Sequence, residues 1–180
     1  MDGHNSALFS KKGDEWETPF SLYSKLDDEF HFQCDAAATL ENTKCEWCIT
    51  DALTLDDWMS GDWIADDGSS GMTKFFLNPP YSKIGAFMKK AYEESLKGAI
   101  VVCLIPARTD TKYFHDYCMK AAEIRFIKGR LQFANRTLPS WRADGNFKMS
   151  SAPFPSIVVV FDEARCKQNG HIMISEIPWR

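Results

Sequence analysis

Four consecutive residues, Asn78-Pro79-Pro80-Tyr81, combine groups that could hold an amino group. They follow the compact apolar stretch Thr73–Leu77, which predicts a strand, and ligands of open α/β sheets bind beyond the carboxyl ends of strands. The prolines lack an N–H and restrict the turn, so the Asn78 side-chain oxygen and the Pro79 carbonyl can act as paired acceptors. Tyr81 adds a flat ring that could stack on a base turned out of a duplex. The alternative is a plain turn that ends a strand and buries a tyrosine.

Charged residues are sorted along the chain, whose formal net charge is −4. From Met1 to Leu77 there are 16 Asp and Glu against 5 Lys and Arg, whereas from Asn78 to Ser150 there are 6 against 13. Lys and Arg gain affinity for phosphates by releasing counterions, so the basic second half favours contact with a polyanion. A solvated, lysine-rich face is the alternative.

The elements that must position these groups alternate between strands and helices. Pro19 marks a helix start, and apolar residues from Phe20 to Phe30 recur at helical spacing. The continuous apolar run Ala99–Ile105 is typical of a strand covered on both faces. The predicted strands are Phe30–Asp35, Thr73–Leu77, Ala99–Ile105, Glu123–Lys128, Arg130–Phe133, Ser156–Phe161 and His171–Ile177, and further helices are predicted at Ser82–Lys97 and Asp110–Ala121.

This alternation predicts an α/β fold with a mixed, mostly parallel sheet and helices on both faces. We expect no helix between Arg130–Phe133 and Ser156–Phe161, so an antiparallel C-terminal hairpin should close one edge of the sheet. A length of 180 residues predicts a single domain, 1–180, with residues 1–13 as a flexible tail. The Gly- and Ser-rich stretch from Ala65 to Met72 predicts a flexible loop.

Composition excludes several classes of protein. A hydrophobic share of 44% with 26% charged residues is that of a globular chain rather than a disordered or fibrous one. No apolar run approaches the roughly 20 residues of a membrane helix, and no signal stretch begins the chain. Six cysteines without an export signal indicate a reducing compartment, so we expect a cytoplasmic protein with free thiols.

Several motifs, in order, make the sequence resemble a known family. The tetrapeptide Asn78-Pro79-Pro80-Tyr81 resembles that of S-adenosylmethionine-dependent amino-methyltransferases, and its neighbours resemble those of phage and prophage DNA N-6-adenine methyltransferases of the Dam-like type. The neighbouring motifs are Trp16-Glu17-Thr18-Pro19, Asp35-Ala36-Ala37-Ala38, Asp51-Ala52-Leu53, Leu104-Ile105-Pro106-Ala107-Arg108-Thr109-Asp110-Thr111 and Gly129-Arg130-Leu131-Gln132-Phe133.

This resemblance implies a Rossmann-like class I methyltransferase fold and a role for each motif. Asn78 and the Pro79 carbonyl would hold the target amino group, with Pro80 and Tyr81 completing the catalytic turn. The implied cofactor is S-adenosylmethionine, and the residues implied to bind it are Trp16, Thr18, Pro19, Asp35, Ala36, Ala37, Asp51, Ala52 and Asn78. The implied substrate is adenine flipped out of double-stranded DNA, in a bacterial host cell.

Cations and aromatic residues of the basic half are candidates for DNA contact. The segment 134–150 is a long polar stretch in which two aromatics stand between cations, a composition suited to phosphate contact and base stacking. The alternative is that Trp141 and Phe147 anchor this segment to the core. The DNA-binding candidates are Arg108, Lys112, Arg130, Arg136, Trp141, Arg142 and Lys148.

Two further interpretations compete with adenine methylation. The same tetrapeptide serves amino-methyltransferases that act on cytosine N4, RNA or a protein amide. The spacing of His31, Cys34, Cys45 and Cys48 would also suit a structural zinc site on a catalytically idle DNA- or zinc-binding module. Residues three apart in a strand face opposite sides, however, so we favour free thiols and no metal.

Overall fold

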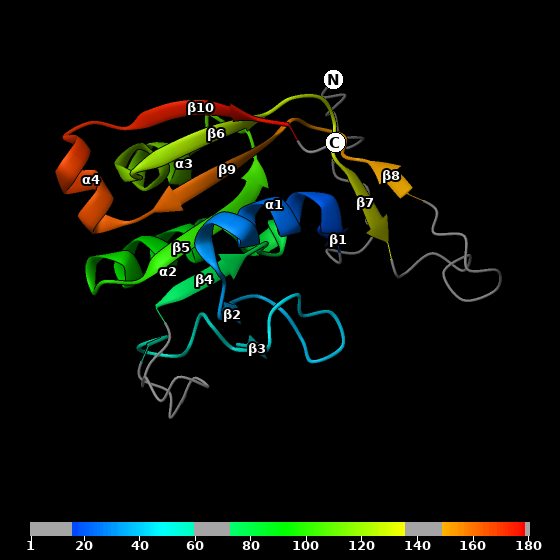
Figure 1. Cartoon of the computed structure of the whole chain (residues 1–180), viewed down its shortest axis with the longest axis horizontal. Coiled ribbons are helices and arrows are strands. Elements are labelled where there is room, and N and C mark those ends of the chain that lie inside the picture. Colours follow the sequence, from blue (N-terminus) through cyan, green and yellow to red (C-terminus); the bar gives the residue numbers. More distant parts are fainter. Residues whose placement is uncertain (1–15, 60–72, 136–148, 179–180) are drawn as a thin grey trace, which may run out of the picture.

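The computed structural model describes residues 16–59, 73–135 and 149–178. Within them, one sheet has seven strands in the order β10-β6-β9-β5-β4-β2-β3 (Figure 1). Its strands are β2 (Cys34–Asp35), β3 (Trp47–Cys48), β4 (Lys74–Leu77), β5 (Ile100–Pro106), β6 (Glu123–Ile127), β9 (Ser156–Phe161) and β10 (Met173–Ile177). A smaller sheet has the order β1-β7-β8, formed by β1 (Trp16–Glu17), β7 (Gln132–Asn135) and β8 (Met149–Ser151).

The large sheet is mixed and mostly parallel, as predicted. Strands β3, β2, β4 and β5 run parallel, and β10 runs parallel to β6. Strand β9 lies between β5 and β6 and runs antiparallel to both. The carboxyl ends of β2, β4, β5 and β6 therefore meet at one edge of the sheet, which we call the carboxyl edge.

The predicted C-terminal hairpin is wrong in two respects. Strand β7, expected as its first arm, leaves the large sheet and pairs antiparallel with β1 and β8. Strand β9, expected at an edge, is internal, and helix α4 (Glu163–Asn169) leads from it to the edge strand β10. Helix α4 was not predicted because it buries no residue and so has no apolar periodicity. Its signals are the Asp162 N-cap and Gly170 in the left-handed region at φ 69°.

Helices cover both faces of the large sheet, as predicted. Alternate residues of β5 enter two separate cores: Val102 and Leu104 pack with α1 (Phe20–Phe30), whereas Val101 and Cys103 pack with α2 (Ile84–Leu96) and α3 (Lys112–Asp116). Since successive side chains of a strand point to opposite faces, α1 lies on one face and α2 with α3 on the other.

Local chemistry explains where the helices begin and end. Helix α1 follows Pro19, its N-cap, and ends where His31 adopts φ 54°. This left-handed residue shortens the predicted strand Phe30–Asp35 to β2 alone. The predicted helix Asp110–Ala121 is only α3 followed by the 3₁₀ turn η3 (Cys118–Lys120), and that at Ser82–Lys97 is α2 preceded by the 3₁₀ turn η2 (Tyr81–Lys83). None of the described helices is long and apolar enough to cross a membrane.

Candidate active site

The carboxyl edge gathers the ends of several strands that carry predicted site residues. Asp35 ends β2, Asn78 follows β4, and Arg108 lies two residues after β5. The short β1 leads directly into Thr18 at the same edge, because Thr18 contacts Asn78. This edge is where an α/β sheet places its ligands.

The Asn78 side chain is held by a residue from the N-terminal part of the chain. Its Nδ2 donates to Oγ1 of Thr18 at 3.1 Å, and Thr18 is only 4% exposed. The two heteroatoms of a planar amide diverge by a fixed angle, so this hydrogen bond also sets the direction of Oδ1. Because Oδ1 is shielded from solvent, a hydrogen bond that it accepts is strengthened by the low local dielectric.

The turn after Asn78 is rigid and leads into a helix. Pro79 is buried, and the carbonyl of Pro80 accepts from the backbone N–H of Lys83 at 3.0 Å. This bond forms η2, so that Tyr81 sits in the first turn before α2. Burial raises the pKa of Tyr81, and its hydroxyl therefore stays protonated at neutral pH.

Phe154 completes an aromatic and cationic cluster that the sequence interpretation missed. Its ring lies edge-on to Tyr81, with centroids 5.3 Å apart and planes at 71°, and Cζ of Arg108 lies 5.4 Å from its centroid. Phe154 reaches this edge because β9, which follows it, runs antiparallel to β5. The backbone N–H of Ala107 donates to the Pro155 carbonyl at 2.9 Å and fixes the approach. Only knowledge of the strand order could have revealed this contact.

Asp35 is a buried carboxylate at the end of β2. Burial raises its pKa to about 6, although hydrogen bonds from the backbone N–H groups of Ala37 (3.3 Å) and Lys44 (3.4 Å) act in the opposite direction. The backbone N–H of Ala36 donates to the Phe76 carbonyl at 2.8 Å. Residues 35–44, which we call the Asp35 loop, are thus held against β4, and Asn78 directly follows this strand.

An ion pair between Glu17 and Lys44 joins β1 to the segment that contacts Asp35. Both side chains are largely buried, each 17% exposed. The sequence interpretation assigned neither residue, because Lys44 lies outside the motifs and no local spacing relates it to Glu17. The N-terminal strand therefore contacts both the Asp35 loop and, through Thr18, Asn78.

Comparison with known proteins accounts for this combination of motifs. The family model described as DNA N-6-adenine-methyltransferase (Dam) matches residues 5–175. The chain belongs to this family. It is similar to the DNA N-6-adenine-methyltransferase of Escherichia phage T1, with 33% identity over 121 residues, and to that of Haemophilus phage HP1, with 29% identity over 160 residues. The matches cover 66% and 85% of this chain, but 46% of the phage T1 protein and 82% of the phage HP1 protein.

In this member of the Dam family, the remaining predicted cofactor residues lie on the turn after β3 and in β1. Asp51 is exposed on the turn after β3, where its carbonyl accepts from Oγ1 of Thr54 at 2.9 Å. Ala52 is buried, and its carbonyl accepts from Nε1 of Trp58 at 2.9 Å. The backbone of Trp16 lies in β1, opposite Asn135 of β7. Their roles toward a cofactor stay predictions.

The DNA-binding candidates of this family member fall into two groups. Lys112 is exposed on α3 and pairs with Asp116, and Arg130 is exposed after β6, with Nη1 at 3.5 Å from the Ala152 carbonyl. With Arg108, they follow β5 and β6 at the carboxyl edge. The remaining candidates, Arg136, Trp141, Arg142 and Lys148, lie outside the described residues, as do residues 1–13 and 65–72.

Not every cation of the basic half is available to DNA in this Dam-family chain. Arg125 is 9% exposed and donates to the carboxylates of Glu29 and Glu123, at 2.7 and 2.8 Å from Nη2. Its guanidinium also lies over the Phe30 ring, with Cζ 5.3 Å from the centroid. Arg125 therefore joins β6 to α1 rather than facing a phosphate.

The four proposed zinc ligands do not assemble. Among the described residues, no three His, Cys, Asp or Glu side chains come together as a metal site. His31 is exposed at the end of α1, whereas Cys45 is buried and lies 3.3 Å from the Tyr23 hydroxyl. Burial raises the pKa of Cys45 to about 12, which keeps the thiol protonated at neutral pH.

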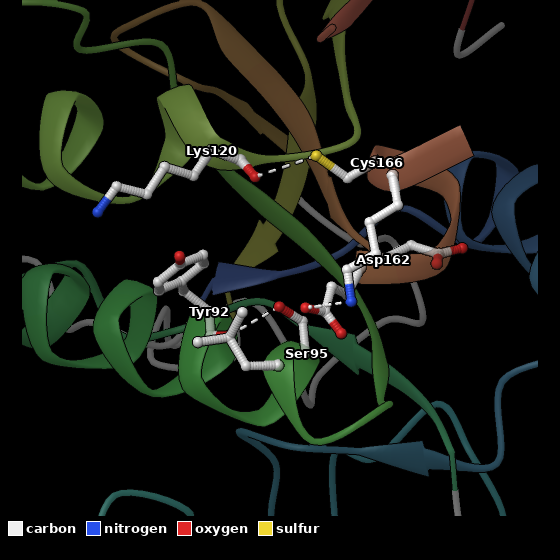
Figure 2. A pocket seen from close by; sticks show the side chains of 8 residues that line it. Tyr92, Ser95, Lys120, Asp162 and Cys166 are labelled. Carbon is white, nitrogen blue, oxygen red and sulfur yellow. Dashed lines mark hydrogen bonds and ion pairs between the residues drawn. The ribbon is translucent and has the colours of Figure 1, made fainter. Parts of the chain in front are cut away.

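A hollow of about 360 Å³ lies at the other end of the sheet, between α2, η3 and α4 (Figure 2). Its charged groups are engaged within the protein: Glu163 pairs with Lys167 at 2.9 Å, and Asp162 accepts from the Arg165 backbone N–H at 3.0 Å. Nζ of Lys120 lies 5.0 Å from the Tyr92 ring centroid. Because β9 enters α4 here and runs antiparallel to β5, this hollow is at the edge opposite Asn78.

Proposed function

We propose that this chain transfers a methyl group from S-adenosylmethionine to the N6 amino group of adenine in DNA. The observation that carries the proposal is the Asn78 amide, which is held by Thr18 directly after β4 and lies three residues before Tyr81. Membership of the DNA N-6-adenine-methyltransferase family supports the same reaction. The names of the relatives from phages T1 and HP1 support DNA as the substrate and a phage origin.

The residues of the catalytic turn would act on the geometry of the target nitrogen. An adenine amino group is a weak nucleophile because its lone pair is delocalised into the ring. Oδ1 of Asn78 and the Pro79 carbonyl would accept its two hydrogens and favour the pyramidal form, in which the lone pair is free to attack. The Tyr81 ring would stack on the flipped base and hold it in the plane that this attack requires.

The Asp35 loop has the chemistry to hold the cofactor. S-adenosylmethionine would supply its methyl group from a positively charged sulfonium centre. A buried carboxylate whose pKa is raised to about 6 is ionised at neutral pH but lacks a full counter-charge in its surroundings. A cation placed nearby would relieve this cost, so Asp35 and the backbone around Ala36 and Ala37 suit the methionine end. Asp51 would then face the adenine end from its exposed turn.

The fold and the substrate geometry belong to the same proposal. We assign the mixed seven-stranded sheet, with helices on both faces, to a Rossmann-like class I methyltransferase in a single domain. Arg108, Lys112 and Arg130 follow β5 and β6 at the carboxyl edge and would contact the phosphates of double-stranded DNA around the flipped adenine. Such contacts position the duplex without reading its sequence.

The decisive experiment is to identify the modified base. The full chain and its Asn78→Ala variant are expressed in a host without DNA methylation, and the DNA is sequenced for modified bases. N6-methyladenine should appear with the wild-type chain and not with the variant. Transfer of labelled methyl groups to purified DNA, RNA and protein tests the alternatives. Label on cytosine, RNA or protein but not on adenine would refute the proposal.

A further inference from the structure

Two residues at the N-terminus of the described chain contact the two loops assigned above to cofactor and base. Glu17, in β1, pairs with Lys44, and Thr18 accepts from the Asn78 amide. Strand β1 itself pairs with β7, opposite Asn135 and Ala134. One short strand therefore connects the small sheet, the Asp35 loop and the catalytic turn.

Lys44 links Glu17 to Asp35. Its side chain contacts Glu17, while its backbone N–H donates to Oδ2 of Asp35 at 3.4 Å. The adjacent Cys45 is buried against Tyr23 of α1, so the segment has little room to shift without breaking these contacts. Neutralising Glu17 would leave the largely buried Lys44 ammonium without this partner, and the segment would move toward water.

We propose that Glu17 and Thr18 are positioning residues of the methyl-transfer site: Glu17 orients the Asp35 loop through Lys44, and Thr18 orients the amide of Asn78. The inference rests on the proposed function, because it assigns cofactor binding to the first loop and base binding to the second. It predicts that Glu17 affects the Kd for S-adenosylmethionine, whereas the adjacent Thr18 affects kcat.

The chemistry of each contact explains this separation. With this role, Thr18 is reassigned from the cofactor, to which the family resemblance assigned it, to the Asn78 amide. The Thr18 hydroxyl fixes the plane and direction of this amide, and a misdirected Oδ1 affects the target nitrogen rather than the cofactor. The Glu17 carboxylate pairs with the Lys44 ammonium and so acts on the position of the Lys44 backbone N–H, which donates to the Asp35 carboxylate. A purely structural role for β1 would instead change both quantities together, in proportion to lost stability.

The test compares Thr18→Val, Thr18→Ser and Glu17→Gln in the full chain. Val keeps the shape of Thr without the hydroxyl, and Ser keeps the hydroxyl. Affinity for S-adenosylmethionine is measured by calorimetric titration without DNA, and kcat is measured with DNA at saturating cofactor. The Glu93→Gln variant is the control for Glu17→Gln, because it removes a glutamate from the exposed pair with Lys89, 3.6 Å apart.

Thr18→Val should lower kcat by about tenfold or more and leave the cofactor Kd within about threefold, while Thr18→Ser restores most of kcat. Glu17→Gln should raise the cofactor Kd by about tenfold and leave kcat within about threefold. Glu93→Gln should change neither. Amide hydrogen exchange at Lys44 in cofactor-free protein should accelerate in Glu17→Gln alone.

The positioning roles are overturned if Thr18→Ser fails to rescue kcat, or if both variants change Kd and kcat by the same factor in step with Tm. A wild-type chain that binds S-adenosylmethionine but leaves DNA unmethylated would refute the DNA function instead. In that case the Glu17→Gln titration and the hydrogen exchange at Lys44 would still decide the role of Glu17.

Discussion

The Thr18 hydroxyl accepts a hydrogen bond from Nδ2 of Asn78 at 3.1 Å, across 60 positions of sequence. The two residues follow strands of different sheets: Thr18 follows β1 of the small sheet, and Asn78 follows β4 of the large one. The turn proposed to be catalytic is therefore held in part by an element that lies outside the α/β sheet. Contacts of the small sheet can thus influence the orientation of the amide.

Replacing Asn78 by Ala should abolish methyl transfer and leave the Kd for S-adenosylmethionine within a few-fold. The amide is proposed to hold the target amino group, and one oriented catalytic hydrogen bond is worth about a hundred-fold or more in rate. Single-turnover assays with DNA and calorimetry with the cofactor measure the two effects. Near-normal turnover would rule out the mechanism.

Replacing Tyr81 by Ala should weaken capture of the base, whereas Phe should retain most activity. Stacking requires a ring, and the hydroxyl, which stays protonated because burial raises its pKa, contributes no charge. Phe would also keep the edge-on contact with Phe154. The measurement is kcat/KM with DNA, and equal damage from Phe and Ala would contradict the stacking role.

Ionisation of Asp35 should make stability depend on pH. Burial raises its pKa from 3.8 to about 6 in the folded protein, so the folded state binds this proton more tightly than the unfolded state. Tighter proton binding in the folded state adds about 3 kcal/mol to the free energy of unfolding below about pH 4. This stabilisation is lost as the pH rises through 6. Urea unfolding of wild type and Asp35→Asn between pH 4 and 8 measures it.

The Asp35→Asn variant should show a flatter profile across this range, whatever its absolute stability. Cofactor affinity supplies a second reading, since an ionised Asp35 is proposed to attract the sulfonium. Affinity of the wild type should fall as the pH drops below 6. A variant with an unchanged stability profile would show that Asp35 does not titrate in this range.

Removing Lys112 or Arg130 should reduce the salt dependence of DNA binding. Each phosphate contact that a substitution removes should lower the steepness of log affinity against log salt by about one. Lys89→Gln is the matched control, because it removes an exposed cation of α2 that is not among the DNA-binding candidates. Slopes that respond equally to Lys112→Gln, Arg130→Gln and Lys89→Gln would place the DNA surface elsewhere.

Replacing Glu94 by Ala should destabilise the fold by about 2 to 4 kcal/mol. Its fully buried carboxylate pairs with Lys90 at 2.7 Å and Lys97 at 2.9 Å, and accepts from the Trp58 backbone N–H at 3.1 Å. The exposed neighbour Glu93 is the control, since Glu93→Ala should cost less than about 0.5 kcal/mol. Equal losses in urea unfolding would show that the buried network contributes little.

The sequence predicted those helices and strands that are marked by apolar spacing or prolines within or next to the segment. Helix α1 and strands β4, β5 and β9 were confirmed, because apolar spacing and the prolines around them depend on neighbours in sequence. Helix α4 has no buried face and left no such signal. The placement of β9 between β5 and β6 depends on pairing distant segments, which no local pattern encodes.

The same distinction applies to the candidate site. The four contiguous residues from Asn78 to Tyr81 follow a strand, as predicted, and their catalytic role stays a prediction. Phe154 and the Glu17–Lys44 pair were missed, because their contacts exist only once the strand order is known. Arg125 was counted among the basic residues and is instead a buried link between β6 and α1.

The internal position of β9 also governs how the chain can fold during synthesis. Strand β9 hydrogen-bonds to β5 on one side and to β6 on the other, although both partners precede it in sequence. Until Phe161 has left the ribosome, both partners present unpaired edges, which are templates for aggregation. These non-local pairings also favour slow folding. The central sheet can close only after β9 has been synthesised, so β5 and β6 must wait unpaired on these edges for a strand that comes later than both.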